Sequence, residues 1–179
     1  MSFARIRALA IVGVLVIAAA IVVTITLAKD RQRGAIVGGG TCTGGQVPVN
    51  LTLLAPKDVK INVFNATDKP GLANDVATDF KNRDFTVVKA DNDPLAKRVE
   101  NVAVLRYGPK RVGAAWVLRA YFLNKGVVGE LDVKRTDDVV DIVVGQQFKQ
   151  IATVTEMHQA LAAAGKPNPP EGTCAGAPA

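Results

Sequence analysis

Seven residues, Asn65 to Gly71 with the sequence NATDKPG, combine groups that can hold an anion. They lie between an apolar run and an amphipathic one, so we expect a sharp turn from a strand into a helix. The first N–H groups of a helix point outward and carry a partial positive charge, which attracts anions, and Lys69 adds a cation. We therefore predict a ligand- or anion-binding site at Asn65, Thr67, Lys69 and Gly71.

The same turn also has a purely structural interpretation. Thr67 or Asp68 can cap the first free N–H groups of the helix, and Pro70 suits a first helical turn because it lacks an N–H group. Gly71 tolerates backbone angles that other residues avoid. The glycine spacing of a Walker or Rossmann phosphate loop is missing, so both interpretations stay open.

Nucleophilic catalysis lacks its components in this sequence. Ser2 is the only serine and His158 the only histidine, while Cys42 and Cys174 lie near the two ends of the chain. A nucleophile needs a neighbouring base, and none of the common triads can be assembled from these residues. We therefore predict a protein that is not an enzyme, without a metal site or a cofactor.

Aspartates are the remaining candidates for acid–base chemistry. We interpret both of their clusters as solvated surfaces, because paired catalytic carboxyls need a defined separation inside a cleft. An enzyme that uses them is a third, less favoured hypothesis. The clusters are Asp91 with Asp93, and Asp137 with Asp138 and Asp141.

The two cysteines suggest a secreted setting. An even pair in a secreted chain favours a disulfide that ties the two ends together, whereas two free thiols are the alternative. Two Asn-X-Thr sequons, at Asn50 and Asn65, match a pattern that is common by chance.

One apolar segment dominates the N-terminal part of the chain. Residues 8–28 contain no charged side chain over about the twenty residues that cross a bilayer, and we favour an uncleaved anchor over a signal peptide cut after Ala28. The formal net charge is +6, but the part after Arg33 carries only about +2, so we expect no nucleic-acid partner.

The rest of the chain divides by composition. We predict a cytoplasmic tip (1–7), a transmembrane anchor (8–28), a flexible stalk (29–57), a folded domain (58–164) and a disordered or extended, Pro/Gly-rich tail (165–179). Within the domain, strands alternate with helices in the order β-α-β-β-α-β, followed by a C-terminal helix over 148–164. This pattern predicts an α+β fold, a small sheet with helices packed on one face.

The first of these units resembles the opening of the LytR C-terminal domain family. In that family a strand leads to Asn-Gly-(Ser/Thr), a spacer and Pro-Gly-Leu-Ala, followed by a helix and a second strand. The matching residues here are Asn65, Thr67, Gly71, Leu72 and Ala73, while Ala66 stands where the family usually has Gly. The later segment VLRYGPKRVGAAWVLRAYF is similar to the family's second half.

The resemblance implies a function and a location. Single-anchor actinobacterial proteins with one such domain maintain the cell envelope, and the domain has no known catalytic residues. It implies a single-pass protein of the cell membrane with its domain outside, and it favours a Cys42–Cys174 disulfide. We expect a scaffold that holds an envelope protein. The alternative is a binding module, either for an anionic wall polymer gripped by cationic side chains or for a lipid between helix and sheet; the cations are Lys69, Lys81, Arg83, Lys97 and Arg98.

Overall fold

The computed structural model describes residues 12–13, 16–24, 42 and 44–176, and the chain forms two compact units, Met1–Val37 and Gly38–Ala179. In the first unit, residues 12–13 and 16–24 are helical. Within the described part of the chain, no helix combines the length and apolarity needed to span a membrane. The predicted tip and much of the predicted anchor (8–28) lie outside the described residues, so the anchor stays a prediction.

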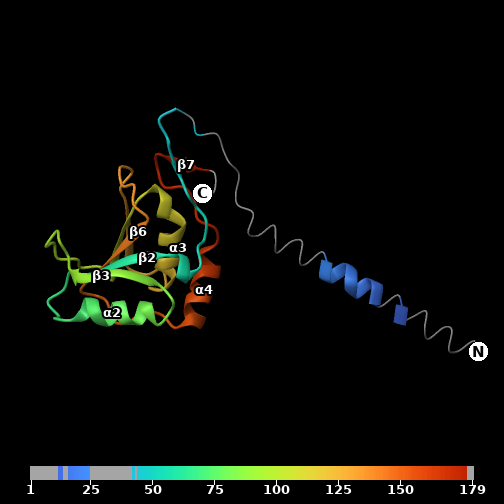
Figure 1. Cartoon of the computed structure of the whole chain (residues 1–179), viewed down its shortest axis with the longest axis horizontal. Helices are drawn as coiled ribbons and strands as arrows, with labels where there is room; N and C mark the ends of the chain where they lie inside the picture. Colours follow the sequence, from blue (N-terminus) through green and yellow to red (C-terminus); the bar gives the residue numbers. More distant parts are fainter. Residues whose placement is uncertain (1–11, 14–15, 25–41, 43, 177–179) are drawn as a thin grey trace, which may run out of the picture. The chain divides into compact units, whose positions relative to one another are not determined.

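The second unit is built on a five-stranded sheet with the strand order β3-β2-β6-β4-β5 (Figure 1). Strand β2 is parallel to β3 and β6, β4 is parallel to β5, and β4 runs antiparallel to β6. The strands are β2 (Lys60–Asn65), β3 (Thr86–Asn92), β4 (Ala103–Tyr107), β5 (Val127–Leu131) and β6 (Val139–Val144).

Three helices lie on one side of this sheet within residues 44–176. They are α2 (Leu72–Lys81), α3 (Val112–Ala120) and α4 (Val154–Ala164), with short 3₁₀ turns η1 (Pro56–Asp58) and η2 (Pro109–Arg111). Figure 1 shows α2 running along β2 and β3. The predicted mixed sheet-and-helix class, with helices on one face, is confirmed.

One part of the predicted order is wrong. The second β-α-β unit closes with β5, which the sequence analysis missed, and the strand predicted from Val139 is β6, which lies between the two units. The C-terminal helix begins at Val154 instead of Phe148. Thr153 caps it, because its hydroxyl accepts from the Glu156 N–H and the Glu156 carboxylate accepts from the Thr153 N–H.

The main core fills the space between the helices and the sheet. Strand residues such as Ile61, Val140 and Ile142 are fully buried there. Rings from three segments meet at its centre: the Phe80 ring lies 5.2 Å from Phe85 and 5.5 Å from Tyr121 between centroids. Phe80 is the last inward residue of α2, so the spacing of apolar residues along this helix places it in the core.

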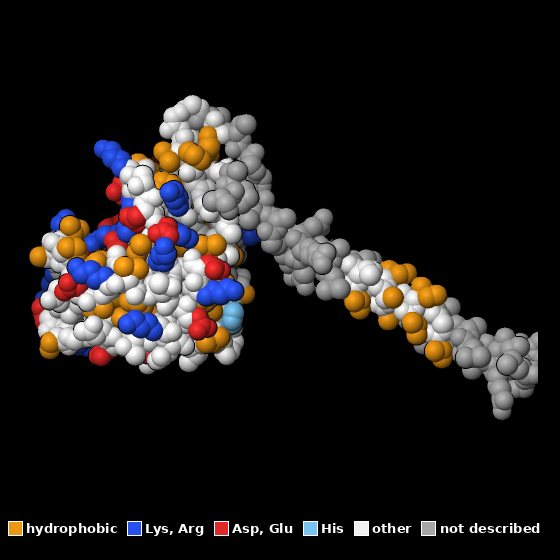
Figure 2. All heavy atoms as spheres, viewed as in Figure 1, with side chains coloured by type: hydrophobic (Ala, Val, Ile, Leu, Met, Phe, Trp, Pro, Cys, Tyr) orange, Lys and Arg blue, Asp and Glu red, His pale blue; other side chains and the backbone are white. Residues whose placement is uncertain are grey.

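The opposite side of the sheet, here called the open face, has a small second core. Phe64, Val104 and Val143 point to this side and are covered by Val99, from the loop of residues 93–102. Figure 2 shows basic and acidic side chains interspersed on the surface in view, without a large patch of one sign. This mixing agrees with the small net charge expected for the part after Arg33.

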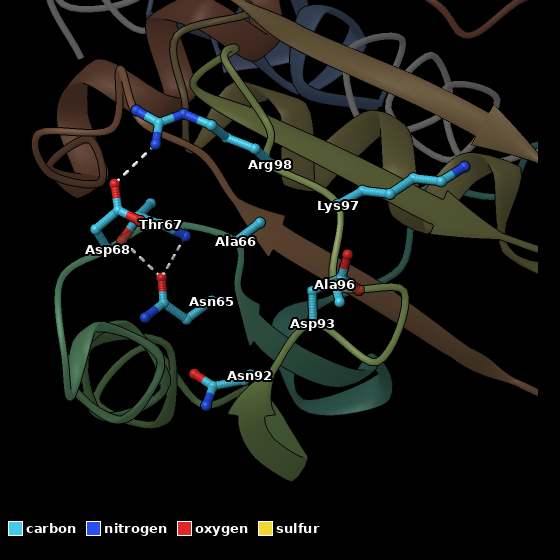
Figure 3. A pocket seen from close by; sticks show the side chains of 9 residues that line it. All are labelled: Asn65, Ala66, Thr67, Asp68, Asn92, Asp93, Ala96, Lys97 and Arg98. Atoms are coloured by element: carbon cyan, nitrogen blue, oxygen red, sulfur yellow. Dashed lines mark hydrogen bonds and ion pairs between the residues drawn. The ribbon is translucent and has the colours of Figure 1, made fainter.

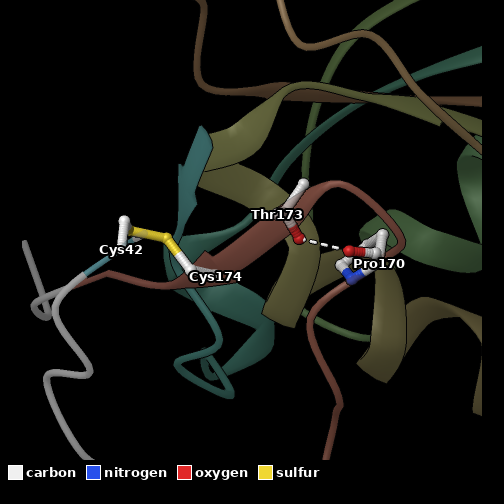
Figure 4. The surroundings of a disulfide bond; sticks show 4 residues. All are labelled: Cys42, Pro170, Thr173 and Cys174. Carbon is white, nitrogen blue, oxygen red and sulfur yellow. Dashed lines mark hydrogen bonds between the residues drawn. A yellow bond between two sulfur atoms is a disulfide. The ribbon is translucent and has the colours of Figure 1, made fainter. Parts of the chain in front are cut away.

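The ends of the second unit form a two-stranded terminal sheet, which corrects the predicted stalk and tail. Strand β1 (Val47–Val49) pairs in parallel with β7 (Thr173–Ala175), and the Cys42–Cys174 disulfide joins the segment before β1 to β7 itself (Figure 4). Val49 and Leu51 are buried against Val112. Residues 44–57 and 165–176 therefore belong to the folded unit, because they bury apolar side chains that their Gly- and Pro-rich composition obscures.

Candidate functional site

The Asn65–Gly71 turn is held together by its own side chains. The Asn65 side-chain oxygen accepts from the N–H and the hydroxyl of Thr67 at 2.9 and 2.7 Å, and its amide donates to the Lys69 carbonyl at 2.7 Å. The Thr67 hydroxyl also accepts from the Lys69 N–H at 3.1 Å. The N–H groups of Thr67 and Lys69 are thus engaged within the turn.

Gly71 begins α2 in a left-handed conformation, with φ of +80°. Its carbonyl accepts from the N–H groups of Asn74 and Asp75, and no side chain caps the helix. The prediction that Thr67 or Asp68 caps α2 is therefore wrong, because the hydroxyl of Thr67 is used one turn earlier. The predicted role of Gly71, to adopt an angle that other residues avoid, is confirmed.

The four predicted site residues do not converge on one empty position. Asn65 is 7% exposed and Thr67 lies beside it, but Lys69 and Gly71 are exposed around the outside of the turn. Beside the helix N-terminus, Asn65 and Gly71 do line one small hollow of about 200 Å³, together with Asn74 and Asp91. Hydrogen bonding to the Asn92 N–H and to Lys89 lowers the pKa of Asp91, so this carboxylate is charged and would repel an anion.

A larger pocket of about 340 Å³ lies at the carboxyl ends of β2 and β3 (Figure 3). In α/β sheets, ligands commonly bind outside the carboxyl ends of the strands. Its walls come from the turn after β2 and from the loop that follows β3. The lining residues are Asn65, Ala66, Thr67, Asp68, Asn92, Asp93, Ala96, Lys97 and Arg98.

Two ion pairs hold the loop of residues 93–102 against this pocket. At the base, Asp93 accepts hydrogen bonds of 2.6 and 3.1 Å from Arg106. At the mouth, Arg98 donates to Asp68 and to Glu100, each at 2.8 Å, and Figure 3 shows its side chain reaching across to Asp68. The loop is therefore tied at its first residue, Asp93, and near its middle, at Arg98.

The cations predicted to grip a polymer together are divided between two ends of α2. Lys97 and Arg98 line the pocket near the start of this helix. Lys81 and Arg83 lie at its far end, about 15 Å along the helix axis, where Arg83 donates to the backbone carbonyls of Asp79 and Ala152. Arg83 thus has a structural role, and the five cations do not form one surface.

A polar row across the open face was missed by the sequence analysis. Lys89, Asn62, Asp141, Arg106 and Glu130 stand side by side on β3, β2, β6, β4 and β5, in that order. Asn62 donates to Asp141 at 2.7 Å, and Arg106 donates to Glu130 at 3.1 Å. Each of these polar residues stands within an apolar run, so the sequence marks each of them separately. That they form one row follows only from the strand order, which the sequence does not give.

The second aspartate cluster is organised by Arg135. Its guanidinium donates to both oxygens of Asp141, at 2.8 and 3.2 Å, and to Asp137 at 2.8 Å. Burial acts to lower the pKa of Arg135, but these hydrogen bonds outweigh it and raise the pKa. Partial burial acts to raise the pKa of Asp137, but hydrogen bonds from Arg135 and from the Val139 N–H lower it. Asp137 and Asp141 are thus held by ion pairs and hydrogen bonds with Arg135.

The structure also places the other features noted in the sequence, which are the sequons, His158, possible metal ligands and the two cysteines. Asn65, one of the two sequon residues, is buried, so its amide is not accessible for glycosylation in the folded chain. His158 lies on the exposed side of α4. Among the described residues, no group of three or more metal-binding side chains occurs. The Cys42–Cys174 disulfide is present, with Cα atoms 5.5 Å apart, as predicted.

These features define a class: a disulfide-closed α/β domain with two β-α-β units and a polar, ion-paired end. A family model described as "LytR cell envelope-related transcriptional attenuator" matches residues 58–148, more than half of the chain. The chain belongs to this family, which confirms the resemblance read from the Asn65–Ala73 segment.

Two similar proteins come from mycobacteria. The chain is 26% identical over 171 residues to cell envelope integrity protein Cei of Mycobacterium tuberculosis, a match that covers 87% of this chain and 78% of that protein. It is 27% identical to the soluble domain of a conserved hypothetical secreted protein from Mycobacterium marinum, whose crystal structure aligns with a TM-score of 0.48 over 70% of this chain and 82% of that one. The family and the Mycobacterium tuberculosis relative support a role in the cell envelope.

Proposed function

We propose that this chain is a non-catalytic, membrane-anchored protein that supports cell envelope integrity by holding a partner protein of the envelope. The observation that carries the non-catalytic part is the state of the candidate acids. Asp93 and Asp141 are bound by arginines, and hydrogen bonds or ion pairs lower the pKa of Asp91, Asp137 and Asp138. A general acid at neutral pH needs the opposite, a raised pKa.

The disulfide supports the location outside the cytoplasm. It links Cys42 to Cys174 across 132 residues and so encloses the whole five-stranded sheet. Disulfides of this structural kind form and persist in oxidising compartments. The proposed anchor at residues 8–28 would then hold the domain on the outer side of the membrane.

The binding-module alternative is less well supported. An anionic polymer would meet Asp68, Asp91 and Glu100 around the pocket, with Lys97 as the cation that has no ion-pair partner among the described residues. A lipid chain between helix and sheet would compete with Phe80, Phe85 and Tyr121, whose rings already occupy that space.

The test is photo-cross-linking in cells with the full chain. A photo-reactive residue at Val128, 41% exposed on the edge strand β5, is compared with one at Val154, 54% exposed on α4. The full chain without a photo-reactive residue serves as the control. Recovery of the same envelope protein from one position and not from the other supports a specific scaffold. Equal recovery from both positions and from the control would contradict it, as would turnover of a wall precursor or glycolipid by the purified chain.

A further inference from the structure

We propose that the pocket at the carboxyl ends of β2 and β3 binds a neutral, hydroxyl-rich ligand, a short saccharide. This inference goes beyond the scaffold function and does not depend on it. The pocket volume of about 340 Å³ falls within the range of about 300 to 1,000 Å³ that small-molecule sites occupy. Its place at the carboxyl ends of parallel strands is where α/β sheets bind ligands.

The charges of the pocket select a neutral ligand. The lining carries two carboxylates, Asp68 and Asp93, and two cations, Lys97 and Arg98, so its formal charge is zero. Glu100 and Asp91 lie beside it, but each is paired with a cation, Arg98 and Lys89. Arg106 is bound to Asp93, so these neighbours together add no net charge. A phosphate or carboxylate entering here would have to approach several fixed carboxylates, at a cost that a neutral ligand avoids.

The hydrogen-bonding groups of the pocket suit hydroxyls. A hydroxyl both donates and accepts, so a site for several hydroxyls needs donors and acceptors close together. The Arg98–Asp68 pair offers both at the mouth. The side-chain amide of Asn92 and the ammonium group of Lys97 have no hydrogen-bond or ion-pair partner among the described residues, and Figure 3 shows Lys97 extending from the rim on the side away from Arg98.

The walls of the pocket are organised before any ligand arrives. The Asn65–Thr67–Lys69 hydrogen bonds fix the turn on one side, and the buried Asp93–Arg106 pair fixes the loop on the other. A ligand therefore loses little affinity to ordering of the protein. None of the lining residues is aromatic, so a ring-stacking platform is missing and the affinity should be in the millimolar range.

The experiment measures saccharide binding to the full chain in phospholipid nanodiscs, because sugar-based detergents would compete. The probes are a neutral trimer of N-acetylglucosamine and an acidic glucuronate oligosaccharide of equal length. Saturation-transfer NMR detects the binding of each. Inorganic phosphate serves as a third probe for a simple anion site. We expect the neutral trimer to bind at least fivefold more tightly than the acidic one, and phosphate not to compete with it.

Asn92→Leu removes the side-chain amide from the pocket wall. Gln159→Leu is its matched control, because Gln159 is an exposed amide on α4 that does not line the pocket. Asn92→Leu should weaken binding of the trimer at least tenfold, whereas Gln159→Leu should leave it unchanged. Tighter binding of the acidic probe, equal effects of the two variants, or absence of saturation with the trimer at about 10 mM would each overturn the proposal.

Discussion

Arg106 and Asp93 form a forked, largely buried ion pair, with two hydrogen bonds of 2.6 and 3.1 Å from one guanidinium to one carboxylate. The Asp93 side chain is 1% exposed and that of Arg106 is 17% exposed. Arg106 is on β4 and Asp93 follows β3, so this contact fastens the loop of residues 93–102 over the open face. The same loop supplies Val99, which covers the second core.

Asp93→Ala should therefore destabilise the domain by about 3 kcal/mol, because it leaves the largely buried guanidinium of Arg106 without its main partner. Asp91→Ala is the matched control. Asp91 is two residues away, its side chain is 54% exposed in its ion pair with Lys89, and its loss should cost less than about 1 kcal/mol. Urea unfolding followed by circular dichroism measures both. Equal losses for the two variants would show that the Asp93 pair adds no stability of its own.

The Cys42–Cys174 disulfide should be the largest single contribution to stability among the residues outside 58–148. It closes a loop of 132 residues in sequence separation, and removing a native disulfide typically costs about 2–5 kcal/mol. We expect the double variant Cys42→Ser/Cys174→Ser to unfold at a clearly lower temperature.

A reducing agent provides the control for this prediction. It should lower the unfolding temperature of the wild type to that of the double-serine variant, and should leave the variant itself unchanged. If reduction lowers both equally, the reagent acts elsewhere and the disulfide is not the cause.

The sequence predicted the first β-α-β unit well because several local signals agree there. Val59, Ile61 and Val63 alternate in the predicted strand, and the apolar residues that follow Gly71 recur at helical spacing. The left-handed angle at Gly71 needs glycine, so the turn position was readable too. The hydrogen bonds between the side chains of Asn65 and Thr67 could not be predicted, because either side chain can bond several backbone groups.

The sequence analysis missed strand β5 because its sequence, VVGEL, has a central glycine and only five residues. Such a segment becomes a strand only through its pairing with β4, which is a tertiary effect. The candidate site was hidden for a similar reason. Its lining comes from two segments, 65–68 and 92–98, and only the pairing of β2 with β3 brings them to the same end of the sheet.

Gly113 and Gly71 should differ in their response to alanine. A Cβ at Gly113 would lie 2.1 Å from the Thr52 carbonyl oxygen, so backbone would have to move. At Gly71 a Cβ would meet nothing within 4 Å, and the penalty comes from the φ of +80° alone. We expect Gly71→Ala to cost about 1 kcal/mol and Gly113→Ala about 3 kcal/mol or more.

Thermal unfolding of both glycine variants checks this difference. The terminal sheet provides a second readout, because Thr52 and its neighbours contact the start of α3 through hydrogen bonds between Asn50 and both Pro109 and Gly113. Protease cleavage before residue 60 should increase in Gly113→Ala and not in Gly71→Ala. A greater loss for Gly71→Ala would contradict the close packing at Gly113.

The ionic network around Arg135 and Lys60 should make stability fall in acid. Burial acts to raise the pKa of Asp137, but Arg135 and the Val139 N–H together lower it, and the pKa of Asp138 is lowered first by Lys60. A carboxyl with a lower pKa in the folded state binds fewer protons there than in the unfolded chain. Its stabilising contribution is therefore complete above the unfolded pKa of about 4 and is lost as the pH falls through the folded pKa.

Urea unfolding between pH 6 and pH 2.5, about the range in which aspartates titrate, measures this loss. The double variant Asp137→Asn/Asp138→Asn should be less stable than the wild type at pH 6 and should lose less stability on acidification, so the two curves converge at low pH. High salt should reduce the difference at pH 6, because both aspartates are about half exposed and their ion pairs are screened. Parallel curves across the whole range would mean that these carboxylates titrate alike in the folded and unfolded chain, and the network would then add no pH-dependent stability.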